Sequence, residues 1–281
     1  MSHVMELLGK TKVVVKDGKV IEVDTPIITY CPIFDKARGI KSITSEEVKK
    51  NMEFRIKDFG MFTNKRKLEF DAFVSFGVSE IMMTGLKNNI IDGTVTVCDG
   101  AGTVITDNPK LVQGMGARMS GLIKTEPIKE VIERIHKQNG IVLDSFTAEI
   151  NPLKGVEKAL KLGMKRIAVS IVHSDTAKKL REIKLEKNIR LIIIGAHVTG
   201  IEKNDAIELI KYADIITSCA SKNVRDVIKP LLQVGTSVPL FAITKVGKDF
   251  LLERAKDIDT PLLISTTKLP HQSEKAPKEL I

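Results

Sequence analysis

Two apolar runs decide the fold of this sequence: Arg166-Ile167-Ala168-Val169-Ser170-Ile171-Val172 and Leu191-Ile192-Ile193-Ile194. Neither run alternates strictly between apolar and polar side chains, which is typical of strands buried on both faces of a parallel sheet. A segment with helical spacing, residues 175–186, lies between them. Because strand, helix and strand in this order favour parallel pairing, the sequence predicts an α/β fold with a mostly parallel sheet and helices on both faces.

Further strands and helices alternate on both sides of these runs. The sequence predicts strands over Thr94–Cys98, Ile141–Leu143, Arg166–Val172, Leu191–Ala196, Asp214–Ser218, Pro239–Ile243 and Leu262–Ile264. It predicts helices over Ile128–Lys137, Val156–Leu162, Asp175–Glu186, Asn204–Tyr212, Lys222–Lys229 and Val246–Ala255.

The start of the chain follows a different pattern. Two short apolar stretches, 12–15 and 20–23, flank Asp17-Gly18, which is typical of a β-hairpin turn. Thr44 lies three residues before Glu47 as in a capping box, and apolar residues then recur at helical spacing. We therefore expect an N-terminal hairpin followed by a helix over about residues 45–59.

The change of pattern predicts two lobes and a tail. Residues 1–150 are expected to form an N-terminal α+β lobe with the hairpin and a Gly-rich loop, and residues 151–267 a Rossmann-like α/β lobe. Residues 268–281 are expected to be a loose C-terminal tail or an arm onto a neighbour. A cluster of phenylalanines between residues 54 and 76 is better explained by core packing than by docking to a partner, although both interpretations stay open.

Composition excludes several classes of protein. The 281 residues carry a net charge of +9, but no Trp, two Tyr and no long basic run, so we expect no nucleic-acid partner. No apolar run approaches the length of a membrane helix, and the first ten residues lack the core of a signal peptide. The sequence thus predicts a cytoplasmic protein with no membrane association.

Cysteine is scarce, and its spacing excludes a disulfide framework. Cys31, Cys98 and Cys219 are far apart and odd in number, and none forms a Cys-x-x-Cys pair. Any metal site would need all three to be brought together by the fold. For each of them a small buried side chain is the favoured alternative, because a cysteine at a strand end is most often a small buried apolar residue.

Polar residues follow several predicted strands at their carboxyl ends, where ligands bind in open parallel sheets. His197 interrupts an apolar strand just before Thr199-Gly200, and Cys219 lies just before Ser221, a predicted N-cap. A thiolate is stabilised near the start of a helix. We therefore predict Cys98, His197 and Cys219 as candidate catalytic residues at one rim.

Two glycine-bearing segments, 99–103 and 113–121, allow two interpretations. Their amides could bind an anion with the charge of Arg118, or the glycines could simply allow tight turns. Neither segment matches a P-loop or a dinucleotide fingerprint. The candidate ligand-binding residues are Gly100, Gly102, Thr103, Arg118, Thr199 and Ser221.

Five motifs together carry a resemblance to a known family: Tyr30-Cys31-Pro32 and residues 54–61, 97–104, 111–116 and 213–222. In this respect the chain resembles methanogenesis marker protein 8, a family found largely in methanogenic archaea, from about Val4 to Leu263. The resemblance implies a role alongside methyl-coenzyme M reductase, in building, activating or supporting that nickel-tetrapyrrole enzyme. It transfers no catalytic residues, and its motif cysteines correspond to Cys31, Cys98 and Cys219.

Three functional hypotheses follow. The first is an accessory factor for methyl-coenzyme M reductase that holds an iron–sulfur cluster on Cys31, Cys98 and Cys219. The second is an enzyme that acts on a small anionic metabolite, with Cys98 or Cys219 as nucleophile and His197 as base. The third is a non-catalytic scaffold for the reductase or its maturation factors. The sequence does not decide whether turnover occurs.

Overall fold

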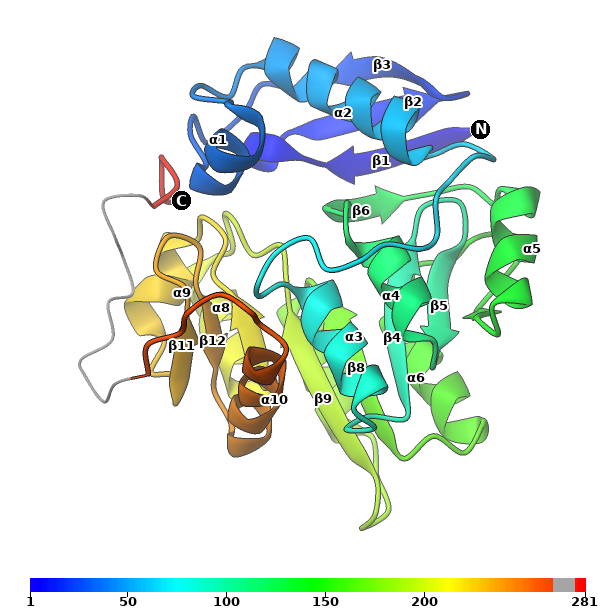
Figure 1. Ribbon diagram of the computed structural model, residues 1–281, viewed down its shortest axis with the longest axis vertical. Helices are drawn as coiled ribbons and strands as arrows, with labels where there is room; N and C mark the ends of the chain where they lie inside the picture. The colour runs from blue at the N-terminus through cyan, green and yellow to red at the C-terminus, as the bar shows by residue number, and fades with distance from the viewer. Residues whose placement is uncertain (265–275) are drawn as a thin grey trace.

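The computed structural model describes residues 1–264 and 276–281, which form two sheets with helices around them (Figure 1). The strands are β1 (Ser2–Glu6), β2 (Lys12–Lys16), β3 (Lys19–Val23), β4 (Gly93–Cys98), β5 (Gly102–Thr106), β6 (Gly121–Lys124), β7 (Ile141–Val142), β8 (Arg166–Ile171), β9 (Arg190–Gly195), β10 (Ile215–Thr217), β11 (Leu232–Val234) and β12 (Leu240–Ala242). The helices are α1 (Pro32–Arg38), α2 (Ser45–Phe59), α3 (Val78–Lys87), α4 (Pro109–Gly116), α5 (Lys129–Lys137), α6 (Pro152–Lys161), α7 (Ser174–Glu182), α8 (Lys203–Tyr212), α9 (Lys222–Val227) and α10 (Lys245–Lys256), with a short 3-10 turn over Leu8–Lys10.

The larger sheet has the strand order β11-β12-β10-β9-β8-β4-β5-β7. Its central strands β4, β8, β9 and β10 pair in parallel, as the two apolar runs predict. The flanking pairs on both sides are antiparallel, so the prediction of a mostly parallel sheet is not confirmed and the sheet is mixed. Hairpins rather than helical crossovers make the β4–β5 and β11–β12 connections, and a hairpin can only produce antiparallel pairing.

Helices cover both faces of the larger sheet (Figure 1). The side chains of β9 alternate between two apolar cores. Ile193 lies in the core between the sheet and helices α6 to α9, and Ile192 and Ile194 lie in the core between the sheet and helices α3 and α10. Burial on both faces explains why the run has no polar alternation.

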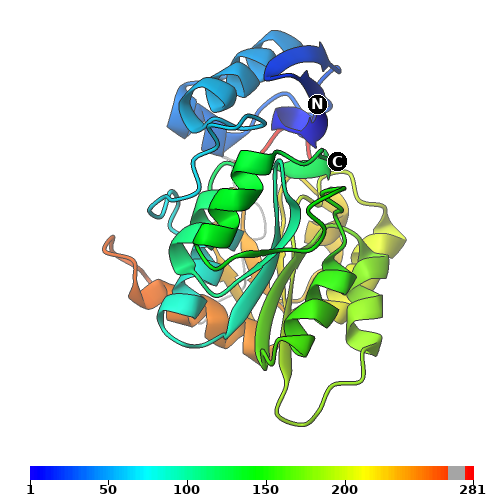
Figure 2. The same cartoon turned by 90° about the vertical axis from the view of Figure 1, so that its right-hand side faces the viewer.

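The smaller sheet, β3-β2-β1-β6, is antiparallel and lies beyond the end of the larger one (Figure 2). The predicted hairpin and the predicted helix α2 are confirmed here, and Thr44 accepts the Glu47 amide at 3.2 Å as its cap. Strand β6 returns from the larger unit to pair with β1. We call this sheet, with α1 and α2, the N-terminal lobe.

The phenylalanine cluster is mainly core, as the packing interpretation expects. Phe54, Phe59, Phe62 and Phe70 belong to the apolar core of the N-terminal lobe, whereas Phe73 is 42% exposed.

Other predicted features have mixed outcomes. The prediction of a strand at 262–264 is wrong, because these residues adopt no regular structure. The lobe boundary at residue 150 stays a prediction. Strands β4, β5 and β7 precede this residue, and they share a sheet with β8, which follows it. Residues 268–275 of the predicted tail lie outside the described residues. The last six residues contact the rest of the chain: Lys278 forms a backbone bridge with Tyr30, and the Ile281 amide donates to the Ala220 carbonyl. Over the described ranges, no helix is both long and apolar enough to cross a membrane.

Candidate functional site at the seam between the sheets

His197 joins the two sheets. It follows β9, and its Nε2 lies 2.6 Å from Oε2 of Glu6, the last residue of β1. Gly121 of β6 lies against the imidazole so closely that a Cβ at this position would overlap the ring. His197 also has a φ of 58°, a left-handed conformation that costs a residue with a side chain about 1 kcal/mol. The surrounding contacts therefore hold the His197 side chain in a defined position, although its backbone is strained. We call the region where His197 meets Glu6 and Gly121, between the two sheets, the seam.

The hydrogen bond to Glu6 assigns roles to the two imidazole nitrogens. A carboxylate that accepts the Nε2 proton leaves Nδ1 as the basic nitrogen. Within the described part of the chain, Nδ1 of His197 makes no hydrogen bond. The side chain is 17% exposed, so this free nitrogen belongs to a group that is only partly buried.

Glu6 is held as an anion. Burial alone would raise the pKa of this carboxyl, but hydrogen bonds from His197 and Lys10 outweigh burial and lower the pKa to about 2. The Lys10 ammonium lies 2.7 Å from the same oxygen that faces His197.

This depressed pKa predicts a pH-dependent contribution to stability. Because the pKa of Glu6 is lower in the folded state, its contribution is complete above about pH 4.5 and is lost as the pH falls toward 2. Between about pH 6 and about pH 3 we expect the wild-type protein to lose about 2 kcal/mol more unfolding free energy than a Glu6→Gln variant. Urea unfolding at both pH values measures the difference, and parallel losses in the two proteins would contradict the role given to Glu6.

Cys219 lies on the adjacent strand end. It follows β10, the parallel neighbour of β9, with a φ of 45°. Its Sγ lies 3.4 Å from Oγ1 of Thr217, and its carbonyl accepts a 2.7 Å bond from Arg225. The next helix, α9, begins as predicted, with Ser221 accepting the Val224 amide at 3.1 Å.

The three cysteines do not converge on one point. Cys31 precedes α1 in the N-terminal lobe, where burial raises the pKa of its thiol and the Cys219 thiol raises it further. Cys98 is completely buried under α4 and α5, its Sγ donates to the Asp99 carbonyl, and burial raises its thiol pKa strongly. Across residues 1–264 and 276–281, no three His, Cys, Asp or Glu side chains are grouped so that they could hold a metal. The structure therefore does not assemble the thiolate set that the iron–sulfur hypothesis requires.

The first glycine-bearing segment forms the tight turn between β4 and β5. The Gly100 amide donates to Thr125 Oγ1 at 2.8 Å, and the Thr103 amide donates to the Glu149 carbonyl at 2.9 Å. Gly102 has a φ of 70° and lies directly against the backbone of residues 148–149. These amides already have partners in the chain, and any anion would have to displace them.

The remaining predicted residues lie nearer the seam. Thr199 accepts the Ala220 amide at 3.1 Å and so ties the loop after β9 to the loop after β10. Arg118 lies between α4 and β6, with its guanidinium 3.4 Å from the Phe73 ring centre. Glu6 was not among the residues predicted from the sequence, because its position in a short strand gives no signal of its long-range contact.

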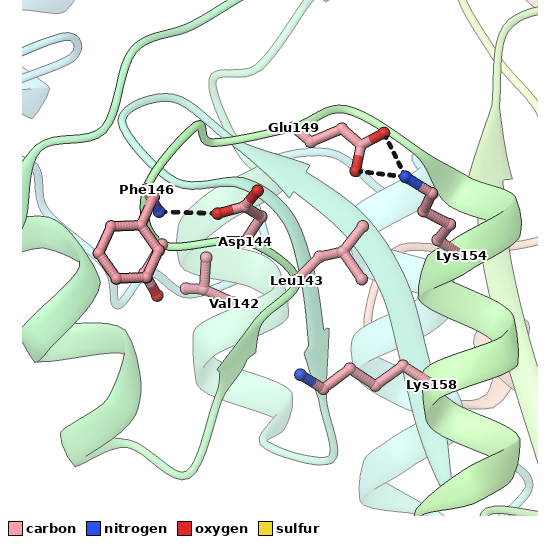
Figure 3. A pocket seen from close by; sticks show the side chains of 8 residues that line it. Val142, Leu143, Asp144, Phe146, Glu149, Lys154 and Lys158 are labelled. Atoms are coloured by element: carbon pink, nitrogen blue, oxygen red, sulfur yellow. Dashed lines mark hydrogen bonds and ion pairs between the residues drawn. The ribbon is translucent and has the colours of Figure 1, made fainter.

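A separate shallow pocket of about 470 Å³ lies along the edge strand β7 and helix α6 (Figure 3). Lys154 bonds to Glu149 at 2.9 Å on one side of it, and Asp144 accepts the Phe146 amide at 2.8 Å on the other. None of the residues predicted from sequence lines this pocket.

Fold and seam together define an α/β protein in which a small antiparallel sheet covers the carboxyl edge of a mixed sheet and holds a histidine–carboxylate pair there. The chain belongs to the family described as uncharacterized proteins conserved in archaea (DUF2099), which matches residues 3–256. It is 50% identical over 282 residues to uncharacterized protein MJ0054 of Methanocaldococcus jannaschii, with 99% of each chain covered. The finer resemblance to methanogenesis marker protein 8 stays a prediction.

One solved structure is also similar in part. A chain of the F420-reducing [NiFe] hydrogenase complex from Methanosarcina barkeri matches with a TM-score of 0.34 and 12% identity, covering 64% of this chain and 72% of the other. A likeness this weak carries no functional argument.

Proposed function

We propose that this protein is an enzyme that performs proton-transfer chemistry on a small anionic metabolite at the seam. In this proposal His197 is the general base, Glu6 orients its ring through the hydrogen bond at Nε2, and Cys219 is the candidate nucleophile on the neighbouring strand end. A base whose second nitrogen is bonded to a carboxylate is the usual arrangement for abstracting a proton from a reacting group.

The observation that carries this proposal is the 2.6 Å contact between His197 and Glu6. It joins residues from two sheets, keeps the carboxyl anionic and leaves Nδ1 without a partner in the described chain. His197 also has a left-handed backbone conformation, one of eight among the described non-glycine residues, and strained conformations of this kind are enriched at functional sites.

The test is depletion of a metabolite from an archaeal small-molecule extract, followed by mass spectrometry. We expect the wild-type protein to convert one anionic compound, and His197→Asn to slow that conversion by about 100-fold or more. Glu6→Gln should slow it less, since the base remains but loses its orientation. Cys219→Ser separates covalent from purely acid–base catalysis.

His136→Asn provides the matched control, because His136 lies on the exposed face of α5. This variant should convert the compound at the wild-type rate. Unchanged extracts with the wild-type protein, or equal rates with His197→Asn, would refute the proposal.

A role in support of methyl-coenzyme M reductase, expected from the resemblance, is compatible with this enzyme and stays a prediction. The archaeal family and the relative from Methanocaldococcus jannaschii agree with that setting. We do not favour an iron–sulfur cluster as part of that role, because Cys98 lies alone in an apolar core.

A further inference from the structure

A group of three arginines lies between α1, α2 and the loop after α4, and nothing in the proposed chemistry uses it. Arg55 is 5% exposed, yet no carboxylate in the described part of the chain pairs with it. Its Nε donates to Asn51 Oδ1 at 2.9 Å, and its Nη1 donates to the Arg118 carbonyl at 2.6 Å and to Ser120 Oγ at 3.1 Å. Neutral acceptors thus hold this buried cation in place.

Aromatic rings hold the other two arginines. The Arg118 guanidinium lies 3.4 Å from the Phe73 ring centre and 4.6 Å from that of Phe59. The Arg38 guanidinium lies 3.5 Å from the ring centre of Phe54, which itself packs edge-on against Phe59 at 5.4 Å. Stacking occupies the guanidinium faces and leaves the N–H edges free. Neither guanidinium makes a hydrogen bond to the described residues.

The three like charges oppose one another. Burial lowers the pKa of Arg55 to about 9, and the nearby charges of Arg118, Arg38 and Arg66 contribute to that lowering. Arg66 is neutralised by Asp99, at 2.8 Å, so it does not need another anion. A buried cation among like charges is costly unless an opposite charge completes the group.

The acidic side chain that acts on Arg118 already accepts hydrogen bonds from other donors. Glu80 is the one carboxylate that opposes the lowered pKa of Arg118. Its oxygens accept bonds from the Gln113 amide at 2.9 Å, from Ser79 at 3.0 Å and from the Phe73 backbone at 3.1 Å. The arginines therefore have free donors and no carboxylate of the described chain to fill them.

We propose that Arg38, Arg55 and Arg118 form a binding site for the oxyanion group of a small metabolite, either a phosphate or a carboxylate. Planar guanidinium groups with free N–H edges match the paired oxygens of both groups. The site runs from the buried Arg55 to the exposed Arg38, so an anion can enter from solvent.

This site adjoins the seam. Ser120 contacts Arg55, and the next residue, Gly121, lies against the His197 ring. An anionic group held by the arginines would place the rest of its molecule near His197. This last step rests on the proposed function, whereas binding of the anion does not.

The test is calorimetric titration of the full chain with inorganic pyrophosphate and, separately, with citrate at constant ionic strength. We expect saturable binding of at least one of them, weakened about tenfold or more by Arg38→Gln and by Arg118→Gln. These two residues are preferable to Arg55, whose three bonds within the fold make its replacement a risk to folding. The probe that binds with the higher affinity shows whether the site prefers phosphate or carboxylate.

Two control variants separate the possible outcomes. Arg190→Gln removes an exposed arginine at the opposite end of the larger sheet and should leave binding unchanged. Lys179→Gln removes an exposed cation on α7 that takes no part in either proposed site, and it should also bind normally. Because calorimetry measures binding without turnover, the anion site can stand even if the proposed catalysis fails. Absence of saturable binding to either probe, or equal binding by the Arg38→Gln and Arg118→Gln variants and the wild-type protein, would overturn this inference.

Discussion

Replacing Asp99 with alanine is expected to lower the free energy of unfolding by about 3–5 kcal/mol. Both Asp99 and its partner Arg66 are completely buried, with Nε and Oδ1 2.8 Å apart. The second carboxylate oxygen accepts the Phe62 amide at 2.7 Å, and Arg66 also donates to the carbonyls of Lys67 and Met115. Alanine would leave a buried guanidinium and a buried amide without their acceptor, which costs far more than the net value of the pair.

Unfolding in guanidinium chloride, monitored by circular dichroism, measures this loss of unfolding free energy. Asp175→Ala is the matched control, because Asp175 pairs with Lys179 while both side chains are more than half exposed. That variant should lose less than about 1 kcal/mol. A loss of similar size in both variants would mean that solvent reaches the Arg66 pair.

The same residue shows where sequence reasoning loses information. Asp99-Gly100-Ala101-Gly102 follows a strand of a parallel set, and such segments usually lead into a helix that points its N-terminus at a ligand. Here the segment turns back into β5, so its amides bond within the chain. The sequence indicates the strand but not the direction of the next one, because a glycine turn serves both connections equally well.

The candidate cysteines show a related limit. The rule that ligands bind at carboxyl ends gives the position of a residue along its strand, but not the face on which its side chain lies. Cys98 and Cys219 both occupy such ends, yet Cys98 packs into the core under α4 and α5 while Cys219 packs on the side of α6 to α9. Only the positions of the covering helices decide between those faces.

Arg55 was not predicted as a site residue, although the sequence contains a signal for it. It lies three residues after Met52 and four before Phe59, which places it on the buried face of α2. A charged side chain on an apolar stripe requires a partner. The strands β8 and β9 and the helix α2, in contrast, were predictable, because burial alone produces their patterns of apolar residues.

Replacing Gly102 with alanine is expected to cost about 3 kcal/mol or more, or to prevent folding. Its φ of 70° is unfavourable for a residue with a side chain, and a Cβ would lie 2.6 Å from the Glu149 carbonyl oxygen and closer still to that of Ala148. Moving residues 148–149 away would break the bond from the Thr103 amide to Glu149, at 2.9 Å. The backbone contact thus adds to the conformational cost. Thermal and urea unfolding measure the total loss of unfolding free energy from both causes.

Gly163→Ala separates the two costs. Gly163 has a φ of 85°, but a Cβ there would have no neighbour within 4 Å. This variant should therefore lose only the conformational part, about 1–2 kcal/mol. A Gly102→Ala protein that is insoluble, or that unfolds well below Gly163→Ala, would show that Gly102 is required for close packing of the chain. Equal midpoints would mean that residues 148–149 move aside at little cost and would contradict the packing role given to Gly102.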